Sequence, residues 1–418
     1  MKRLSFVVFI FILMYSSRIF AQTDQISSNA QPLALSDCYA FALKQSETIA
    51  IDSEVIKEAE AHFLQSLGTL LPQVSFVESQ TRNYSHDNSS YNKSFERKFV
   101  FKQTLFSGFK EFIALSGSRL ETNQRINEKK RAEQLLFADV VDAFYLLMQQ
   151  REDLKTLETI RASLIERIDD LKERRNIGRS RPSEVVNTEL QLYNLEAEIE
   201  SVKSQEIIAR QLLEFLIGRP VAEISDSDIS LASLNEEASY KAKAESRSDV
   251  LADNFAWGVS KQKVSGAISE LFPTVSLEGD YYMHRSTVPT DSQWYALLKV
   301  DVPLFEGTTT YGLIKEAKAK SREDELQFAR TKRLAVQDIQ DAYARAETSI
   351  SRKDALEKAF KAAELNYSLQ KQDYELNLVN NLDVLQALQT LEDTRRNFTH
   401  AQYERKRFYW QLQAAIGE

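Results

Sequence analysis

The chain has 418 residues, of which only 11 are glycine and 7 are proline. Average usage, near 7% and 5%, would give about 29 glycines and about 21 prolines. Because tight turns need residues that tolerate or fix unusual φ values, this shortage disfavours sandwiches, propellers and nucleotide-binding α/β folds. Charged residues make up 27% and hydrophobic residues 43%, which disfavours a disordered chain and a polytopic helical membrane protein. The composition predicts a few very long helices.

The charges and cysteines also exclude several functions. The formal charge is −8, from 53 basic and 61 acidic residues, and there is no basic block, so nucleic acid is not an expected partner. A single cysteine excludes a disulfide framework and a thiolate zinc site. The four histidines show no metal-ligand spacing, and no phosphate loop, nucleophile elbow or catalytic pair is found. We therefore expect no catalytic residues, no metal site and no cofactor.

The first 21 residues have the layout of a secretory signal peptide. Lys2 and Arg3 precede an apolar run over residues 4–15, and a plausible cleavage point follows Ala21. The run is too short for a membrane span, which needs about 20 apolar residues, so an uncleaved anchor is disfavoured. The mature chain is expected to be exported.

The mature chain reads as a tandem duplication. Short motifs recur in the same order with offsets of 199 to 201 residues, and four such matches in register exceed chance. The matched pairs are residues 70–76 with 271–277, 105–108 with 304–307, 139–144 with 338–343, and 216–218 with 415–417. We therefore predict repeat 1 at 22–217, an inter-repeat linker at 218–236 and repeat 2 at 237–418.

Each repeat is predicted to contain a helix of about 35 residues that ends at Pro72 or Pro273, then two strands, then a long helical hairpin. Residues 118–177 contain neither glycine nor proline, and as one helix they would be roughly 90 Å long. Apolar residues in this stretch step by threes and fours, as in a coiled coil. The window 135–148, apolar except for two aspartates, is expected to be a buried helix junction. The predicted strands are about 73–84, 95–106, 274–284 and 293–305, and the predicted helical tips are about 177–183 and 376–382.

The predicted strands alternate between apolar and polar residues, which is the pattern of a strand that faces lipid on one side. From alternation alone, a soluble sheet packed on one face is an equal alternative. In repeat 1 Arg97 shares the apolar face, and we expect it near the membrane interface. The residues predicted to face the membrane are Trp294, Ala296, Leu298, Val300, Val302, Val275, Leu277, Tyr281, Phe99 and Phe101.

The number of strands constrains the predicted membrane architecture more than their hydropathy does. One chain offers four strands, and an open sheet cannot lie in lipid because its edges would carry unpaired backbone groups. Known membrane barrels have about eight strands or more. If these strands are in a membrane, several chains must combine to close a barrel.

The signal peptide, the duplication, the strand hairpins and the glycine-poor helical hairpins together resemble the TolC family of outer-membrane efflux proteins. The motifs that carry the resemblance are Leu-Pro-x-Val-Ser at 71–75, Phe-Pro-Thr-Val-Ser at 272–276, the Leu-Phe-x-Gly strand exits, and the tip from Tyr374 into residues 382–387. The resemblance covers essentially the whole mature chain.

The resemblance implies a mainly α fold with a membrane β-barrel portion, in which a homotrimer shares a twelve-stranded barrel continuous with a periplasmic α-helical barrel. It implies location in the outer membrane, with a long periplasmic portion. Family members are passive exit ducts for drugs, metals or proteins. They dock on an inner-membrane transporter through a periplasmic adaptor.

The resemblance also implies an acidic ring at the periplasmic gate. By position, the two tips supply Glu184 and Asp383, which in a trimer would give six carboxylates close to the axis. Like charges that close raise one another's pKa and attract cations. The family's second acidic position is Gln386 here, so the ring is expected to be weaker. Helix capping and first-turn charge are an equally weighted role for both carboxylates.

Family members often hold the gate shut with a tyrosine and an arginine near the tip. Tyr374 matches the tyrosine, whereas the arginine position is Val379. Arg179 and Arg181, on the other tip, are candidates to replace that arginine by pairing with Asp383.

The alternative function is a periplasmic coiled-coil adaptor or structural scaffold without membrane strands. Adaptors usually carry a single helical hairpin between β-rich halves, whereas this sequence predicts two hairpins in tandem. The sequence therefore favours the outer-membrane exit duct, gated by its helical tips. An enzyme is the weakest option.

Overall fold

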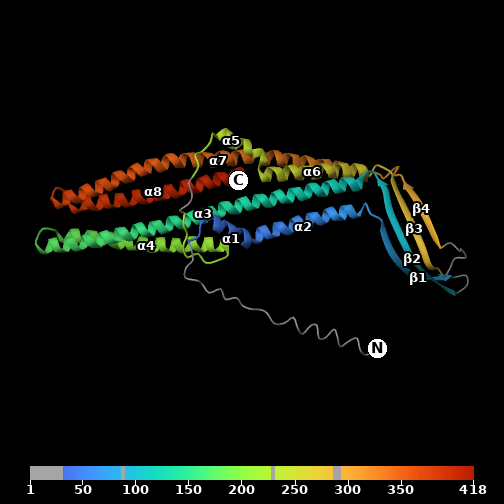
Figure 1. Ribbon diagram of the computed structural model, residues 1–418, viewed down its shortest axis with the longest axis horizontal. Coiled ribbons are helices and arrows are strands. Elements are labelled where there is room, and N and C mark those ends of the chain that lie inside the picture. Colours follow the sequence, from blue (N-terminus) through green and yellow to red (C-terminus); the bar gives the residue numbers. More distant parts are fainter. Residues whose placement is uncertain (1–31, 86–89, 227–230, 286–292) are drawn as a thin grey trace, which may run out of the picture.

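The computed structural model describes residues 32–85, 90–226, 231–285 and 293–418. The predicted signal peptide, residues 1–21, lies outside the described residues. The described chain is elongated, with a small sheet at one end and two long helical hairpins side by side (Figure 1). The predicted combination of strand hairpins with long helical hairpins is confirmed.

The main helices come in pairs of equal length, one in each half of the chain. Each half contains a helix of 22 residues, one of 67 residues and one of 36 residues. The pairs are α2 (Glu47–Gly68) with α6 (Ser248–Ser269), α3 (Lys110–Asn176) with α7 (Thr309–Glu375), and α4 (Pro182–Ile217) with α8 (Asn381–Ile416). Equal lengths in the same order are what an internal duplication produces.

The prediction of one continuous helix before each strand pair is wrong. In the first half the chain forms α1 (Leu35–Gln45) and then α2, because Ser46 adopts an extended conformation and its side chain caps α2 at the Ile49 amide, 3.4 Å away. In the second half α5 (Glu237–Lys241) and a 3-10 turn, η1 (Ala242–Ser246), precede α6.

The two helical tips have the same backbone geometry although their sequences differ. Gly178 and Asn377 both take positive φ, 76° and 60°. Asparagine is one of the few residues besides glycine that adopts this conformation readily. The amides of Arg179 and Leu378 then close each helix by donating back to a carbonyl of its last turn, at 2.8 and 2.9 Å. The tip loops cover residues 177–181 and 376–380, two residues shorter than predicted, because α4 and α8 begin at once.

The sheet is antiparallel and has the strand order β1-β2-β3-β4, so the strand hairpins of the two repeats pair through β2 and β3. Its strands are β1 (Gln73–Ser85), β2 (Ser90–Ser107), β3 (Thr274–Arg285) and β4 (Trp294–Asp301). Compared with the predicted ranges, β2 is longer at both ends and β4 stops early. Pro303, which has no amide to donate to a ladder, lies just beyond the end of β4.

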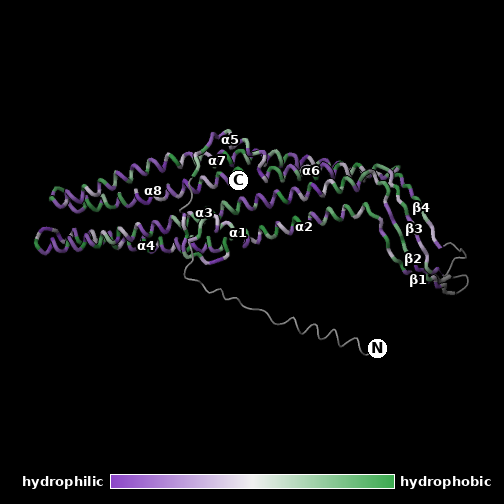
Figure 2. The backbone as a smooth tube through the Cα atoms, viewed as in Figure 1, coloured by the Kyte–Doolittle hydropathy of each residue, from purple (hydrophilic) through white to green (hydrophobic). Residues whose placement is uncertain are grey.

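The main core cluster lies where α1, α3 and α4 meet, midway along the molecule. The window 135–148 supplies much of it, including fully buried Val140, Phe144 and Leu147, which pack with Cys38 of α1 and Leu213 of α4. The predicted buried junction is confirmed. Hydrophobic and hydrophilic residues otherwise alternate along the helices (Figure 2). Among the described residues, no helix combines the length and apolarity required to cross a membrane.

Candidate functional site: the strand face and the helical tips

The strand register brings the predicted membrane-facing residues onto one face of the sheet. Residues paired across antiparallel strands lie on the same side. Phe99 pairs with Tyr281, which in turn pairs with Trp294. The pairs Leu277–Leu298 and Val275–Val300 continue this face, as does the ladder from Phe101 through Gly279 to Ala296. Most of these side chains are exposed in the single chain. Val302 lies just after β4 and is also exposed.

The opposite face of the sheet is polar. Lys98 of β2 forms a 2.6 Å ion pair with Asp280 of β3, whose side chain is 5% exposed, and the Tyr282 hydroxyl donates to the same carboxylate. A sheet with one apolar and one charged face fits a boundary between lipid and water. On the apolar face Arg97 is paired with Glu78 of the neighbouring strand at 3.1 Å, so the one charge predicted there has a partner.

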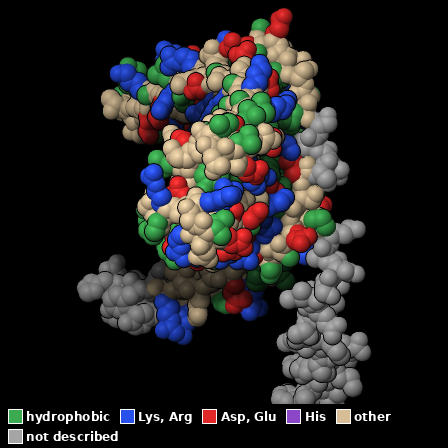
Figure 3. Space-filling model, turned by 90° about the vertical axis from the view of Figure 1, so that its left-hand side faces the viewer, with side chains coloured by type: hydrophobic (Ala, Val, Ile, Leu, Met, Phe, Trp, Pro, Cys, Tyr) green, Lys and Arg blue, Asp and Glu red, His purple; other side chains and the backbone are tan. Residues whose placement is uncertain are grey.

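The other end of the molecule carries the two helical tips. Viewed onto this end, hydrophobic, basic and acidic side chains are interspersed (Figure 3). The aliphatic side chains at the tips are largely exposed, namely Ile177, Leu376, Leu378 and Leu382. Exposed apolar side chains gathered at one end of an elongated molecule are typical of a surface that contacts another protein.

Both predicted gate carboxylates lie in the first turn of a tip helix and accept hydrogen bonds there. The Asp383 carboxylate accepts from the Asn380 amide at 3.0 Å, and the Glu184 carboxylate accepts from the Arg181 amide at 3.3 Å and from the Ser180 hydroxyl. The capping role is therefore present. Within the described chain, no ion pair joins Arg179 or Arg181 to Asp383, and both arginines are exposed. Gln386 is exposed one turn further along α8.

Tyr374, the predicted gate tyrosine, is held by two arginines of α3 that sequence reasoning missed. The Arg167 guanidinium lies 3.8 Å from the centre of the Tyr374 ring, and that of Arg174 lies 4.9 Å away. Asp170 accepts from both arginines, at 3.3 and 3.1 Å, and so fixes their positions. The tyrosine is 6% exposed, and burial raises the pKa of its phenol, so the ring is neutral at physiological pH.

A buried polar chain continues from this tyrosine site across three helices. Arg167 Nε donates to Asn381 Oδ1 at 3.0 Å, and Asn381 Nδ2 donates to Thr188 Oγ1 at 3.1 Å. Asn381 is 1% exposed and Thr188 is fully buried. The chain joins α3, α8 and α4 just above the tips. We refer to the set Arg167, Asp170, Arg174, Tyr374, Asn381 and Thr188 as the inter-hairpin clamp.

The clamp rests on a small apolar cluster formed by Leu171, Val185, Tyr374 and Val384, which come from all four long helices. Leu171 was foreseeable from the three- and four-residue spacing within residues 118–177. The arginines were not, because spacing along α3 gives the face on which a residue lies but not the helix that it meets. The available signal was the set Arg167, Asp170 and Arg174, which spacing places on one face of a helix.

No group of three or more histidine, cysteine, aspartate or glutamate side chains that could hold a metal ion occurs among the described residues. The distinctive features of the described chain are a sheet with one apolar face and a buried clamp near the helical tips. Comparison with solved structures gives the class to which this fold belongs. It superimposes on VceC, an outer membrane protein of Vibrio cholerae, with a TM-score of 0.82 and 19% identity, over 92% of this chain and 96% of VceC. It also matches the open state of the Neisseria gonorrhoeae outer membrane channel MtrE, with a TM-score of 0.78 and 18% identity, over 92% and 88% of the two chains.

The fold is that of outer-membrane channels. Sequence comparison narrows the class: residues 240–418 match the family model described as outer membrane efflux protein. The outer membrane protein TolC of Vibrio cholerae is 22% identical over 376 residues, which cover 84% of this chain and 83% of TolC. The chain is thus similar to outer membrane efflux proteins over its second half and to TolC over most of its length. It is an exit duct of the outer membrane and not an enzyme, and the adaptor alternative is set aside.

Proposed function

We propose that three copies of this chain form the duct, with a shared twelve-stranded barrel in the outer membrane and a helical barrel in the periplasm. The observation that carries this proposal is the four-stranded sheet with an apolar face and a free edge on both β1 and β4 within the described chain. In lipid each unpaired backbone group costs several kcal/mol, so these edges must find partners. Joining β4 of one copy to β1 of the next closes the sheet.

The internal duplication supports a specific register for that junction. Within one chain, Gln103 of β2 pairs with Leu277 of β3. The repeat equivalent of Gln103, 199 residues later, is Val302 after β4, and that of Leu277, 201 residues earlier, is Phe76 of β1. If the junction between copies repeats the β2–β3 pairing, Val302 of one copy therefore lies opposite Phe76 of the next. Pairing of β4 with a neighbouring copy would also account for the different ends of the two equivalent strands, since β4 stops at Asp301 while β2 runs to Ser107. In the single chain β4 lacks the neighbour on its second side that β2 has.

We expect cysteines at Val302 and Phe76 to link neighbouring copies. Facing residues in adjacent strands have Cβ atoms about 4.5–5.5 Å apart, which a disulfide can bridge after small adjustment. Oxidised outer membranes carrying Val302→Cys with Phe76→Cys should give covalent trimers on a non-reducing gel. The matched control is Val302→Cys with Val77→Cys, in which the second cysteine lies on the opposite face. Equal cross-linking of both pairs, or of neither, would contradict the register.

The helices also have two free edges. Because α3 packs on α8 between the two hairpins, α4 and α7 lie at the two ends of the helical layer. Both present exposed apolar residues at helical spacing, Val186, Leu190 and Tyr193 on α4 and Leu365 and Leu369 on α7. In a ring of three copies these stripes would meet, α7 of one copy against α4 of the next. This is a head-to-tail contact that closes by rotation.

We propose that the inter-hairpin clamp holds the periplasmic gate closed, and that outward movement of the tips opens it. The clamp is the only polar contact described between the hairpins this close to the tips, and it joins the second hairpin, through Tyr374 and Asn381, to Arg167 of the first. The expected partners are a periplasmic adaptor (membrane fusion protein), which would contact the exposed tips, and an inner-membrane transporter, which would supply the energy. The duct itself conducts passively.

A second part of the gate is the proposed ring of Glu184 and Asp383 close to the trimer axis. The double variant Glu184→Gln with Asp383→Asn keeps a side-chain oxygen at both capping positions but removes six charges from the trimer. Because polyvalent cations bind where like charges gather, the concentration of hexaamminecobalt that halves single-channel current should rise several-fold. Glu200→Gln, an exposed acidic position far from the tips, is the control. Unchanged block in the double variant would place the cation site elsewhere.

The duct proposal as a whole is tested by reconstitution. Purified protein in planar lipid bilayers should give ion-conducting channels, and the outer-membrane fraction should retain it during a detergent-free wash. Release of the protein as a soluble monomer by that wash would contradict the membrane assignment of the strands.

A further inference from the structure

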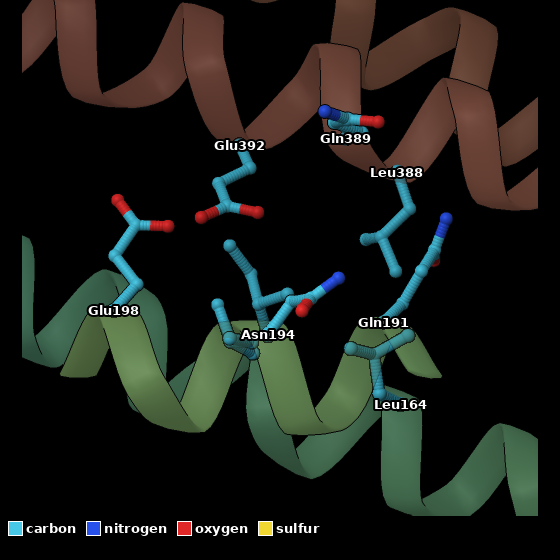
Figure 4. Close-up of a pocket in the computed structure, with 9 residues that line it drawn as sticks. Leu164, Gln191, Asn194, Glu198, Leu388, Gln389 and Glu392 are labelled. Atoms are coloured by element: carbon cyan, nitrogen blue, oxygen red, sulfur yellow. The ribbon is translucent and has the colours of Figure 1, made fainter. Parts of the chain in front are cut away.

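Two carboxylates face each other between the helical hairpins, well above the tips. Glu198 of α4 and Glu392 of α8 point toward one another across a cavity of about 290 Å³ (Figure 4). The floor of the cavity is apolar and includes Leu164 of α3 and Leu388 of α8. The remaining polar groups are uncharged amides such as Asn194. The proposed gate and the clamp do not involve this pair.

The two carboxylates are unequally satisfied. Glu198 forms an ion pair with Arg396, one turn after Glu392 on α8. Arg396 is also within 3.8 Å of Asp153 on α3, whose other oxygen is 2.7 Å from His400. The nearest cation is therefore already shared by two other carboxylates.

Glu392 itself has no hydrogen bond and no ion pair among the described residues. The charged groups near it are Glu198 on α4, with Arg396 and Asp393 on α8, and α3 adds only apolar side chains to this cavity. Burial, and next the charge of Glu198, raise the pKa of the Glu392 carboxyl from 4.5 to about 7. Partial burial without a partner disfavours the charged form of a carboxyl, so the group keeps its proton to higher pH than a hydrated glutamate does.

We propose that Glu392, together with Glu198, forms a proton-controlled latch between α4 and α8. With its proton, Glu392 can donate to Glu198 or to a neighbouring amide, and the two hairpins stay packed. Without it, an unpaired Glu392 carboxylate faces Glu198, whose own cation Arg396 is already shared with Asp153, and the contact between the two hairpins loosens. This inference rests on the proposed function, because loosening matters if the hairpins move when the duct opens.

The direction of the pH effect follows from the raised pKa. When α4 and α8 are packed together, an arrangement we call the packed seam, Glu392 holds its proton up to about pH 7, whereas a hydrated glutamate loses it near pH 4.5. The packed seam binds more protons between these values, so it is favoured at low pH and weakens as pH rises through this window. Above the window Glu392 is charged, and the cost of that charge between the hairpins is fully present.

The unpaired carboxyl is a feature of the second hairpin alone, because the 199-residue offset places Tyr193 at the equivalent position of α4.

The latch predicts that channel conductance depends on pH and that one substitution removes this dependence. The wild-type protein in planar bilayers should conduct several-fold more at pH 8 than at pH 5. Glu392→Gln imitates the protonated side chain and should remain at the low level throughout. Glu198→Gln removes the facing charge and should move the midpoint to lower pH while the rise persists. Glu200→Gln, exposed on α4, should behave as wild type.

A pH response that came from His400 or from the tip carboxylates would persist in Glu392→Gln, so a full rise in that variant would overturn the latch. Absence of a rise in the conducting wild type would do the same. If no variant conducts, the proposed duct fails, and spin labels at Ser201 and Thr390 still test the latch. Their distance distribution, in trimers with one labelled chain, should broaden above pH 7 in wild type and stay narrow in Glu392→Gln. Identical distributions in both would contradict it.

Discussion

Replacing Arg167 by alanine is expected to raise the conductance of the reconstituted channel several-fold. Arg167 contacts the face of Tyr374, donates to Asn381 and pairs with Asp170, so its loss removes the hydrogen bond from α3 to α8 and the closer of the two arginine contacts with Tyr374 of α7. A desolvated cation–π contact contributes about 2 kcal/mol, and a hydrogen bond from a charged donor contributes about 1.5–3 kcal/mol. Even partial loss of this energy shifts a closed–open equilibrium by an order of magnitude or more.

Two further variants separate the clamp from general damage. Arg175→Ala removes an exposed arginine from the last turn of the same helix and should leave conductance unchanged. Tyr374→Phe keeps the ring over which the guanidiniums lie and should also remain near wild type, whereas Tyr374→Ala should conduct like Arg167→Ala. An effect of Tyr374→Phe as large as that of Tyr374→Ala would show that the hydroxyl, not the ring, holds the gate.

The helical architecture was predictable because its stop signals are local. Glycine and proline are so scarce that most of them mark an element end, and Gly218 and Gly417 close their hairpins with positive φ. Asn377 continues this rule with a different residue. The break at Ser46 was missed because serine is common inside and outside helices, and its capping role depends on the local backbone.

The clamp could not be predicted from the sequence for a different reason. The resemblance to a known family predicts Tyr374 as a gate residue, but its partners Arg167 and Arg174 lie in the other repeat. Helical periodicity shows that they share a face with Asp170, and it contains no information about which helix packs there. The contact depends on how the two hairpins cross, which is a property of the tertiary structure. The same limit applies to Glu198 and Glu392.

The strand face was predictable in composition but not in extent. Alternation indicates which side chains share a face, since period two is a local property, and the register aligns the apolar ones across four strands. The end of β4 depends instead on what lies beside it. Val302 belongs to the apolar pattern but lies outside the strand, and we attribute this to the missing neighbour in the single chain.

Replacing Leu298 by arginine should prevent assembly in the outer membrane, whereas the same change at the adjacent Leu297 should be tolerated. The two side chains are similarly accessible in the single chain, 61% and 45% exposed, but they lie on opposite faces of β4. An arginine on the lipid face near the middle of the bilayer costs about 2–4 kcal/mol. Three copies in one barrel would multiply that cost, which then approaches the whole stability of a typical domain.

An arginine at position 297 would instead lie opposite Glu278 on the polar face, where a cross-strand ion pair can form. The measurement is the amount of trimer in outer-membrane fractions, resolved on gels without boiling. Trimer should be lost in Leu298→Arg and kept in Leu297→Arg. Because the variants differ by one position and not in chemistry, a general intolerance of charge in β4 predicts equal loss in both. Equal loss would mean that neither face of this sheet lines water, and loss in Leu297→Arg alone would reverse the assignment of the faces.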